Sequence, residues 1–206
     1  MIFFNKQKGN KMKNINKIII AFALLSTTIF AQTKWNFDFA HSEVGFSVTH
    51  MLISETDGFF KDYTGSIVTI GDNFENAQIN FEAKTASIFT DNEKRDKHLA
   101  SPDFFDAEKY PTLTFVSTSF TKVDDKNYKL VGNLTIKEVT KEVTLDVKYN
   151  GTINDPWGNT RAGFKVSGEV DRFTYGLTWN AALETGGLVV SKEVDLNIKI
   201  ELIKEK

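Results

Sequence analysis

Apolar and polar residues alternate with a period of two along most of the chain after residue 31. Successive side chains of a β-strand point to opposite faces, so this pattern is typical of strands with one buried face. The alternation predicts about eight strands, most of them long. They cover residues 44–50, 59–70, 79–84, 113–121, 128–136, 143–149, 164–170 and 194–203.

Short polar segments separate these runs, as at residues 71–73, 124–127 and 154–159. Long strands joined by such turns favour an antiparallel meander, which packs as a sandwich or closes as a barrel. Closure removes exposed strand edges, and a barrel of about eight strands is either filled by side chains or holds one small ligand. We therefore expect an all-β fold that forms an eight-stranded antiparallel barrel.

The phase of the alternation predicts which side chains point into the barrel. The inward apolar set is Phe46, Val48, Phe81, Phe115, Leu134 and Val166. His50 follows the same phase and is either a core histidine bonded to a neighbouring polar group or a cavity histidine that contacts a ligand. Ala83 and Gly132 also occupy inward positions, where small residues can leave space.

Residues 90–106 interrupt the alternation. Thr90 followed by Glu93 resembles a capping box, and Ser101 before Pro102 is typical of a helix start. We expect two short helices that cover one end of the barrel. The polar run 95–99 within them is either a solvated helix face or a polar lip that receives a ligand head group.

The first 31 residues have the features of a secretory signal peptide. Five lysines and no acidic residue precede an apolar run at 18–25, and the segment ends at Ala31. That apolar run is too short for a comfortable membrane span, so we expect no stable span after processing. The expected organisation is a cleaved signal peptide at 1–31, starting at Met1 or Met12, and one domain at 32–206. A retained N-terminal anchor is the alternative.

The net charge of the chain after residue 31 limits the classes of binding partner that we expect. Without the leader it has 20 basic and 27 acidic residues, a formal net charge of −7. This balance argues against nucleic-acid binding and against electrostatic adhesion to an anionic membrane. The chain also contains no Cys, so thiolate chemistry and disulfides are excluded.

Motifs for catalysis are sparse. The sequence has three histidines, no G-x-S-x-G and no H-E-x-x-H, so hydrolase and zinc chemistry find no support, and no metal site is expected. Asp96 with His98 is the acid–base pair that an enzyme would use. We therefore expect a binding protein, with an enzyme acting through Asp96 and His98 and a closed-core structural domain as the alternatives.

Several segments in order resemble one family. They are the strand at 39–51 with its H-S-x-V-x-F-x-V-x-H pattern, the segment 58–65, the stretch 95–111 with R-D-x-H-L and D-F-F-D, residues 132–141, and the segment 172–177 that contains Tyr175. Together they resemble the YceI-like polyisoprenoid-binding proteins over about residues 35–203. Glu138 stands where the family pattern has Gly.

The resemblance implies an extended, lipocalin-like barrel in the periplasm or outside the cell, with an apolar tunnel for a long isoprenoid chain. The implied partner is a long-chain lipid such as an isoprenoid quinone or prenyl phosphate. The oligomeric state is left open, with a homodimer as one alternative. No cofactor is expected apart from a bound isoprenoid or fatty lipid. The expected ligand-binding residues are Phe46, Val48, His50, Phe81, Asp96, His98, Phe115, Leu134, Val166 and Tyr175, with Asp96 and His98 bordering the polar end.

Export with cleavage near Ala31 is the first testable prediction. The order of basic and apolar segments in residues 1–31 is the reason. N-terminal sequencing of the exported protein should begin close to Gln32. Recovery of a periplasmic protein that still starts at Met1 or Met12 would contradict it.

Overall fold

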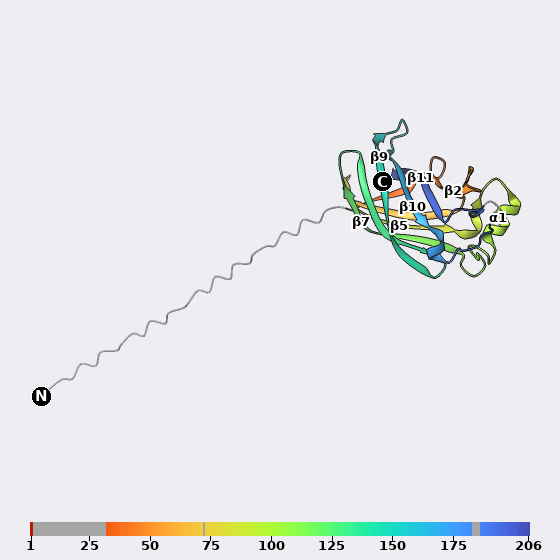
Figure 1. The fold of residues 1–206 in the computed structure, drawn as a ribbon. Helices are drawn as coiled ribbons and strands as arrows, with labels where there is room; N and C mark the ends of the chain where they lie inside the picture. The colour runs from red at the N-terminus through yellow and green to blue at the C-terminus, as the bar shows by residue number, and fades with distance from the viewer. Residues whose placement is uncertain (2–31, 72, 183–185) are drawn as a thin grey trace.

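The computed structural model describes residues 1, 32–71, 73–182 and 186–206, which form an all-β barrel with a short α-helix at one end (Figure 1). The strands are β1 (Gln32–Phe37), β2 (Glu43–His50), β3 (Ser54–Phe60), β4 (Tyr63–Ile70), β5 (Asn73–Lys84), β6 (Ile88–Phe89), β7 (Thr112–Lys122), β8 (Asn127–Ile136), β9 (Val139–Asn154), β10 (Thr160–Asp171) and β11 (Glu193–Lys204). Apart from Met1, the expected signal peptide at 1–31 lies outside the described residues, and its cleavage stays a prediction.

Eight of the described strands close into an antiparallel ring. Their order is β1, β4, β5, β7, β8, β9, β10, β11, and β11 pairs back with β1. The expected eight-stranded antiparallel barrel is confirmed. Most neighbours in the ring are also neighbours in sequence, as an antiparallel meander requires.

Strand β11 pairs with two different strands along one edge. Residues 202–204 pair with β1, whereas residues 195–199 pair with β2. β2 pairs with β3, and β3 pairs with β6. These three strands therefore extend the barrel wall toward α1, which directly follows β6 in the chain.

The expected single strand at 59–70 is wrong, because two strands, β3 and β4, occupy this region. Phe60 and Tyr63 are both buried although they are three residues apart. One continuous strand would place them on opposite faces. A turn at Lys61 and Asp62 solves this conflict, and both backbone N–H groups donate to Ser87, one to its carbonyl and one to its hydroxyl.

Strand β1 was not predicted from the sequence, because its alternation of apolar and polar residues is short. Its inward phase is marked by two residues, Trp35 and Phe37, which directly follow the expected signal peptide. Both are buried in the structure. A pattern of this length cannot be separated from a loop by periodicity alone.

The helical insertion is also simpler than expected. One α-helix, α1 (Glu93–Ala100), forms in the described part of this segment, and its N-cap is Asn92 instead of Thr90. The Asn92 side chain accepts a hydrogen bond from the backbone of Arg95. The expected second helix is wrong, because residues 101–106 form turns and the Ser101 hydroxyl donates to the carbonyl of His98 at the end of α1.

The two remaining helical turns are 3₁₀ segments, η1 (Thr85–Ser87) and η2 (Arg172–Tyr175). η1 connects β5 to β6, and η2 follows β10 at the same end of the barrel as α1 (Figure 1). In the part of the chain that the structure describes, no helix has the length and apolar character needed to cross a membrane.

The barrel end opposite α1 is packed with aromatic rings. Phe74 lies at its centre, with ring centroids 4.9 Å from Trp35 and 4.8 Å from Phe164. Tyr149 packs against both Phe74 and Phe164. The Trp35 indole N–H donates to the Thr69 hydroxyl, so its polar atom is satisfied although the side chain is buried. Large rings at this end fill the interior.

An ion-pair network ties the strand ends around this aromatic cluster. The Arg161 guanidinium bonds the carboxylates of Asp38, Asp155 and Glu201, at 2.6 Å for the last two. These acids come from the β1–β2 connection, the β9–β10 turn and β11. The hydrogen bond from Arg161 holds the pKa of Asp155 well below its ordinary value. Burial would raise the pKa of Asp38, but hydrogen bonds from His41 and Arg161 outweigh it and lower that pKa.

This network predicts a specific acid sensitivity. Carboxyl groups with a depressed folded-state pKa contribute stability that is present above their ordinary pKa of 3.8 and is lost as pH falls through the folded value. The Arg161→Met variant should therefore be less stable at about pH 7 and should show a shallower loss of stability below about pH 5. Urea unfolding of both proteins across this range measures the effect. Parallel pH profiles would show that Arg161 does not control these carboxyl groups.

Candidate functional site

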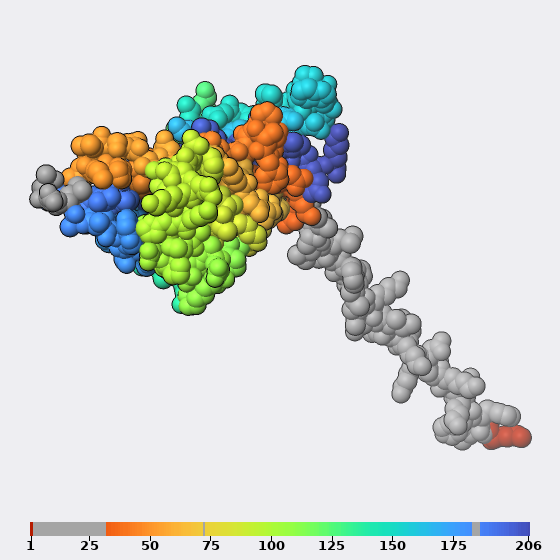
Figure 2. Space-filling view, turned by 90° about the vertical axis from the view of Figure 1, so that its right-hand side faces the viewer, coloured from red at the N-terminus to blue at the C-terminus, as the bar shows by residue number. Residues whose placement is uncertain are grey.

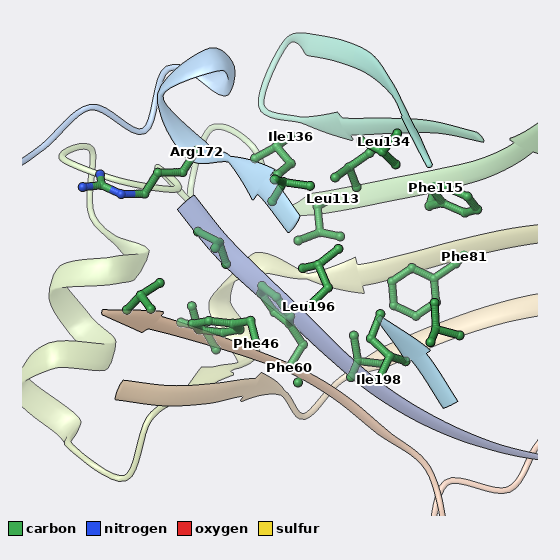
Figure 3. A pocket seen from close by; sticks show the side chains of 18 of the residues that line it. Phe46, Phe60, Phe81, Leu113, Phe115, Leu134, Ile136, Arg172, Leu196 and Ile198 are labelled. Atoms are coloured by element: carbon green, nitrogen blue, oxygen red, sulfur yellow. The ribbon is translucent and has the colours of Figure 1, made fainter. Parts of the chain in front are cut away.

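A cavity of about 660 Å³ lies inside the barrel. Pockets that bind small molecules typically measure about 300–1,000 Å³ and are lined mainly by apolar groups. Figure 3 shows apolar side chains from neighbouring strands pointing into this space. The barrel is therefore not filled by its own side chains, which is the feature that separates a ligand-holding barrel from a closed core.

Most of the expected ligand-binding residues line the cavity. They are Phe46, Val48, His50, Phe81, His98, Phe115, Leu134 and Val166. Phe81 on β5 pairs in register with Phe115 on β7, and Phe115 pairs with Leu134 on β8, so the three form a continuous apolar band (Figure 3). Their contact with a ligand stays a prediction.

Small inward residues do not create the empty space, contrary to the sequence expectation. A Cβ atom at Gly132 would lie 2.3 Å from the ring of Phe115, so this glycine makes room for a phenylalanine. Gly58 does the same for Phe46, at 2.4 Å. Ala83 is fully buried and is not part of the cavity lining. These glycines let large rings lie flat against the wall, and the centre stays open.

Polar lining residues gather at the α1 end of the cavity. They come from the β2–β3 hairpin, from α1 and the connection before it, and from η2. This group is His50, Thr56, Thr90, Asn92, Lys94, Arg95, His98 and Arg172. The opposite end is lined by apolar side chains such as Phe74, Phe120 and Phe164. The cavity therefore has the polarity of an amphiphile, with an apolar length and one polar end.

Asp96 does not border the cavity, so this part of the site expectation is wrong. Its carboxylate accepts hydrogen bonds from the Thr90 backbone N–H at 2.9 Å and from the Thr90 hydroxyl at 2.6 Å. Arg95, its neighbour, donates from Nε to the Thr90 hydroxyl and from Nη2 to the Thr90 carbonyl. These contacts fix the connection between β6 and α1 and leave Asp96 without a cavity-facing role.

His98 lines the cavity, but it pairs with a different acid than expected. Its Nε2 atom lies 2.9 Å from a carboxylate oxygen of Asp103. Its ring packs edge-on against Trp179 and Phe104. The Asp96–His98 acid–base pair of the enzyme alternative therefore does not form.

Tyr175 is buried, yet it is not among the cavity-lining residues. It lies in η2, where a 3₁₀ turn replaces the period-two geometry of β10. Burial raises the pKa of its hydroxyl. Tyr175 was expected at the site because its segment resembles the family, and its contact with a ligand stays a prediction although it does not line the cavity.

Arg172 lines the cavity and was not among the expected site residues. Its side chain is buried and donates to the carbonyls of Leu177, Trp179, Val190 and Ser191. Among the described residues, no carboxylate lies within ion-pair distance of it. Burial lowers its pKa, although arginine stays charged at neutral pH.

A sequence signal for Arg172 existed. It continues the inward phase of Phe164, Val166, Gly168 and Val170, so it should point into the barrel. Figure 3 shows its guanidinium beyond one end of the row of apolar side chains, on the side of α1. Arg172 therefore fixes the segment after η2 and brings a positive charge to the polar end of the cavity.

One group of side chains has metal-ligating character. Asp38, His41 and Glu201 place ligand atoms within 4.8 Å of one another at the barrel end opposite α1. Arg161 already donates to both of these carboxylates. A guanidinium in this position supplies the positive charge that a cation would bring, so we assign this cluster to the ion-pair network.

Comparisons with known proteins agree with this architecture. A family model described as YceI-like domain matches residues 35–202. A UPF0312 protein of Pseudomonas putida strain F1 is 35% identical over 196 residues, which cover 94% of this chain and 98% of the relative. A UPF0312 protein of Staphylococcus epidermidis is 39% identical over 170 residues, which cover 82% of this chain and 96% of the relative.

Solved structures share the fold. The Campylobacter jejuni YCEI protein is 34% identical with a TM-score of 0.68, over 82% of this chain and 96% of its own. A polyisoprenoid binding domain from Saccharophagus degradans is 15% identical with a TM-score of 0.60, over 83% of this chain and 98% of its own, and this likeness concerns the fold alone. Because the family model spans most of the chain and the relatives match it nearly end to end, this chain belongs to the YceI-like family.

Proposed function

We propose that this protein is an exported carrier that holds the chain of an isoprenoid or similar long-chain lipid inside its barrel. The observation that carries the proposal is the cavity, whose length is apolar and whose polar groups lie at one end. The polyisoprenoid binding domain of Saccharophagus degradans has the same fold and supports this ligand class. Isoprenoid quinones and prenyl phosphates are the amphiphiles we expect.

Apolar burial supplies the binding energy. Removing apolar surface from water contributes roughly 25 cal/mol per Å², less the cost of ordering a flexible chain. Phe81, Phe115 and Leu134 offer a continuous wall for the chain, and Phe46 faces the same space from β2. The lipid tail lies toward the aromatic end, and the head group lies toward α1.

The polar end is suited to a head group with hydrogen-bond acceptors. Lys94, Arg95 and His98 line it from α1, and Arg172 adds a positive charge. Charge-assisted hydrogen bonds to phosphate or carbonyl oxygens are stronger than neutral ones. Phosphorylated or quinone head groups both present such oxygens.

Export fits this role. A long isoprenoid chain is insoluble in water, and a barrel that encloses it would move it through an aqueous compartment. We propose that residues 32–206 form the mature carrier in the periplasm or outside the cell, after removal of residues 1–31.

Binding is favoured over catalysis by the hydrogen-bond partners at the polar end. Asp96 is engaged by Thr90, and His98 is engaged by Asp103. A general base must reach a proton on the substrate with its partner positioned behind it. His98 and Asp103 have this arrangement, but none of the described cavity-lining residues is an Asp, Glu, Ser or Cys that could act as a nucleophile or a second acid–base group, so we propose that His98 recognises a polar group.

A charge placed in the tunnel should abolish lipid retention. Phe81→Asp introduces a carboxylate among apolar side chains, at a large desolvation cost. Val116→Asp is the matched control, because Val116 is exposed on the outer face of the adjacent strand β7. Native mass spectrometry of the purified proteins should show bound lipid for the wild type and the control only.

Folding of Phe81→Asp is checked by circular dichroism and size-exclusion chromatography. If this variant does not fold, Val166→Trp tests the same tunnel by filling it, and it should shorten the longest chain that the protein retains. A folded Phe81→Asp protein that keeps the same lipid at the same stoichiometry contradicts the tunnel model, as does unchanged chain length in Val166→Trp.

We expect His98 to affect which lipid head group the protein prefers and to have no effect on how it binds the lipid tail. Loss of one hydrogen bond is worth about 1 kcal/mol, or roughly fivefold in affinity. His98→Ala should change the preference between a polyprenol and a polyprenyl phosphate of equal length by about that factor. Competition binding with the two lipids measures the preference. An unchanged preference would remove His98 from the head-group site and leave the tail model in place.

A further inference from the structure

The mouth of the cavity carries exposed apolar side chains on a tight turn. Met51, Leu52 and Ile53 join β2 to β3 and are 42%, 66% and 86% exposed. Leu188, across from them, is 39% exposed. We call these four residues the mouth tip. Exposed apolar side chains that cluster beside a binding site usually mark an interaction surface.

The backbone of the mouth tip is unusual for such residues. Met51 and Leu52 both have positive φ angles, 51° and 66°, and the Ile53 N–H donates to the His50 carbonyl. Positive φ at both central positions and this hydrogen bond are typical of a type I′ turn, whose central positions favour Asn and Gly. Bulky apolar residues in the left-handed region are strained, and such strain is concentrated at functional positions.

Contacts between two segments hold the mouth tip in place. The Met51 N–H donates to the Val189 carbonyl at 2.8 Å, and the Ser191 N–H donates to the Thr49 carbonyl at 2.9 Å. His50 forms a β-bridge with Val190, and Leu52 lies against Gly187. The turn and the segment after η2 therefore form one wall. Figure 2 shows the orange β2–β3 region and the blue segment together at the end of the molecule beside α1.

Apolar surface continues from the cavity to the mouth tip. Val189 and Val190 line the cavity, their chain neighbour Leu188 is exposed, and Met51, whose N–H donates to the Val189 carbonyl, is exposed as well. A lipid chain that enters along this wall would stay in contact with apolar groups between the outside and the interior. Such a path avoids the desolvation and rehydration steps that make chain transfer through water slow.

We propose that the mouth tip inserts into a lipid bilayer and docks the cavity mouth on it, so that the lipid passes directly between membrane and barrel. This inference rests on the proposed function, because a bilayer is where a long-chain lipid resides. Side chains that project from a tight turn offer a partner protein no groove or flat face, whereas the acyl region of a bilayer deforms around them.

Charges near the mouth agree with docking driven by apolar groups. Lys94, Arg95 and Lys97 on α1 are accompanied by Glu55, Asp57 and Glu93, so neither sign dominates. The mature chain is acidic overall, with a formal net charge of −7. Docking should therefore need no anionic lipid, in contrast to basic peripheral proteins.

The test uses a variant that removes the apolar groups and relieves the strain. Met51→Asn, Leu52→Gly and Ile53→Thr together place the favoured Asn-Gly pair in the turn, so the variant should be at least as stable as the wild type. Ile153→Asp is the control, because Ile153 is 65% exposed at the barrel end opposite α1. All are made in the mature chain of residues 32–206.

Two readouts are measured for each protein with phosphatidylcholine vesicles, with and without phosphatidylglycerol. They are co-sedimentation with the vesicles and the rate at which a fluorescent polyprenyl lipid moves from vesicle to protein. The triple variant should lose both by on the order of tenfold, and Ile153→Asp should lose neither. Lipid supplied from detergent micelles should fill the triple variant to the wild-type level.

Equal vesicle binding by wild type and triple variant would overturn the docking proposal. Self-association of the wild type in analytical ultracentrifugation, lost in the triple variant without any vesicle binding, would overturn it in favour of a second copy as the partner. Failure of every protein to take up lipid from micelles would refute the proposed function instead, and co-sedimentation would still decide whether the mouth tip binds a bilayer.

Discussion

The shared edge of β11 is the constraint on which the rest of the structure depends. Residues 202–204 pair with β1 and close the barrel, while residues 195–199 pair with β2 and extend the wall toward α1. The closed part surrounds the aromatic cluster, and the Arg161 network lies at the same end of the barrel. The extended part carries the polar lining and the cavity mouth. One strand with two partners therefore gives the barrel a sealed end and an end that can receive a ligand.

The two ends also differ in how their charges are satisfied. Arg161 bonds one carboxylate from the β1–β2 connection, one from the β9–β10 turn and one from β11. Arg172 donates to backbone carbonyls, and among the described residues no carboxylate lies within ion-pair distance of it. The first arrangement stabilises a closed end. The second leaves a positive potential beside the cavity, where a polar or anionic head group would be attracted.

The sequence predicted the properties that depend on strand phase. A period of two places Phe46, Phe81, Leu134 and Val166 on the inward face, and these residues line the cavity. If this alternation is continued by two residues beyond Val170, it places Arg172 on the inward face as well. The prediction failed at β3 and β4 because the turn at Lys61 and Asp62 resets the phase between Phe60 and Tyr63.

Other features depend on contacts that no local pattern encodes. The carboxylate of Asp96 is taken by Thr90, six residues earlier, so its place in a polar cluster did not make it a cavity residue. Gly132 looked like a source of space, yet the ring of Phe115 lies where its side chain would be. The first outcome is set by a contact between α1 and the connection before it and the second by cross-strand packing, and the composition of the chain predicts neither.

The central claim is that the cavity holds one long-chain lipid. The most direct measurement is mass spectrometry of the lipids extracted from the mature protein after native purification from its own host, with the stoichiometry taken from the intact complex. The account predicts a long-chain amphiphile, of the isoprenoid class, at close to one molecule per chain. A protein that carries no lipid, and takes up none when an excess of long polyprenyl chains is supplied, would contradict it.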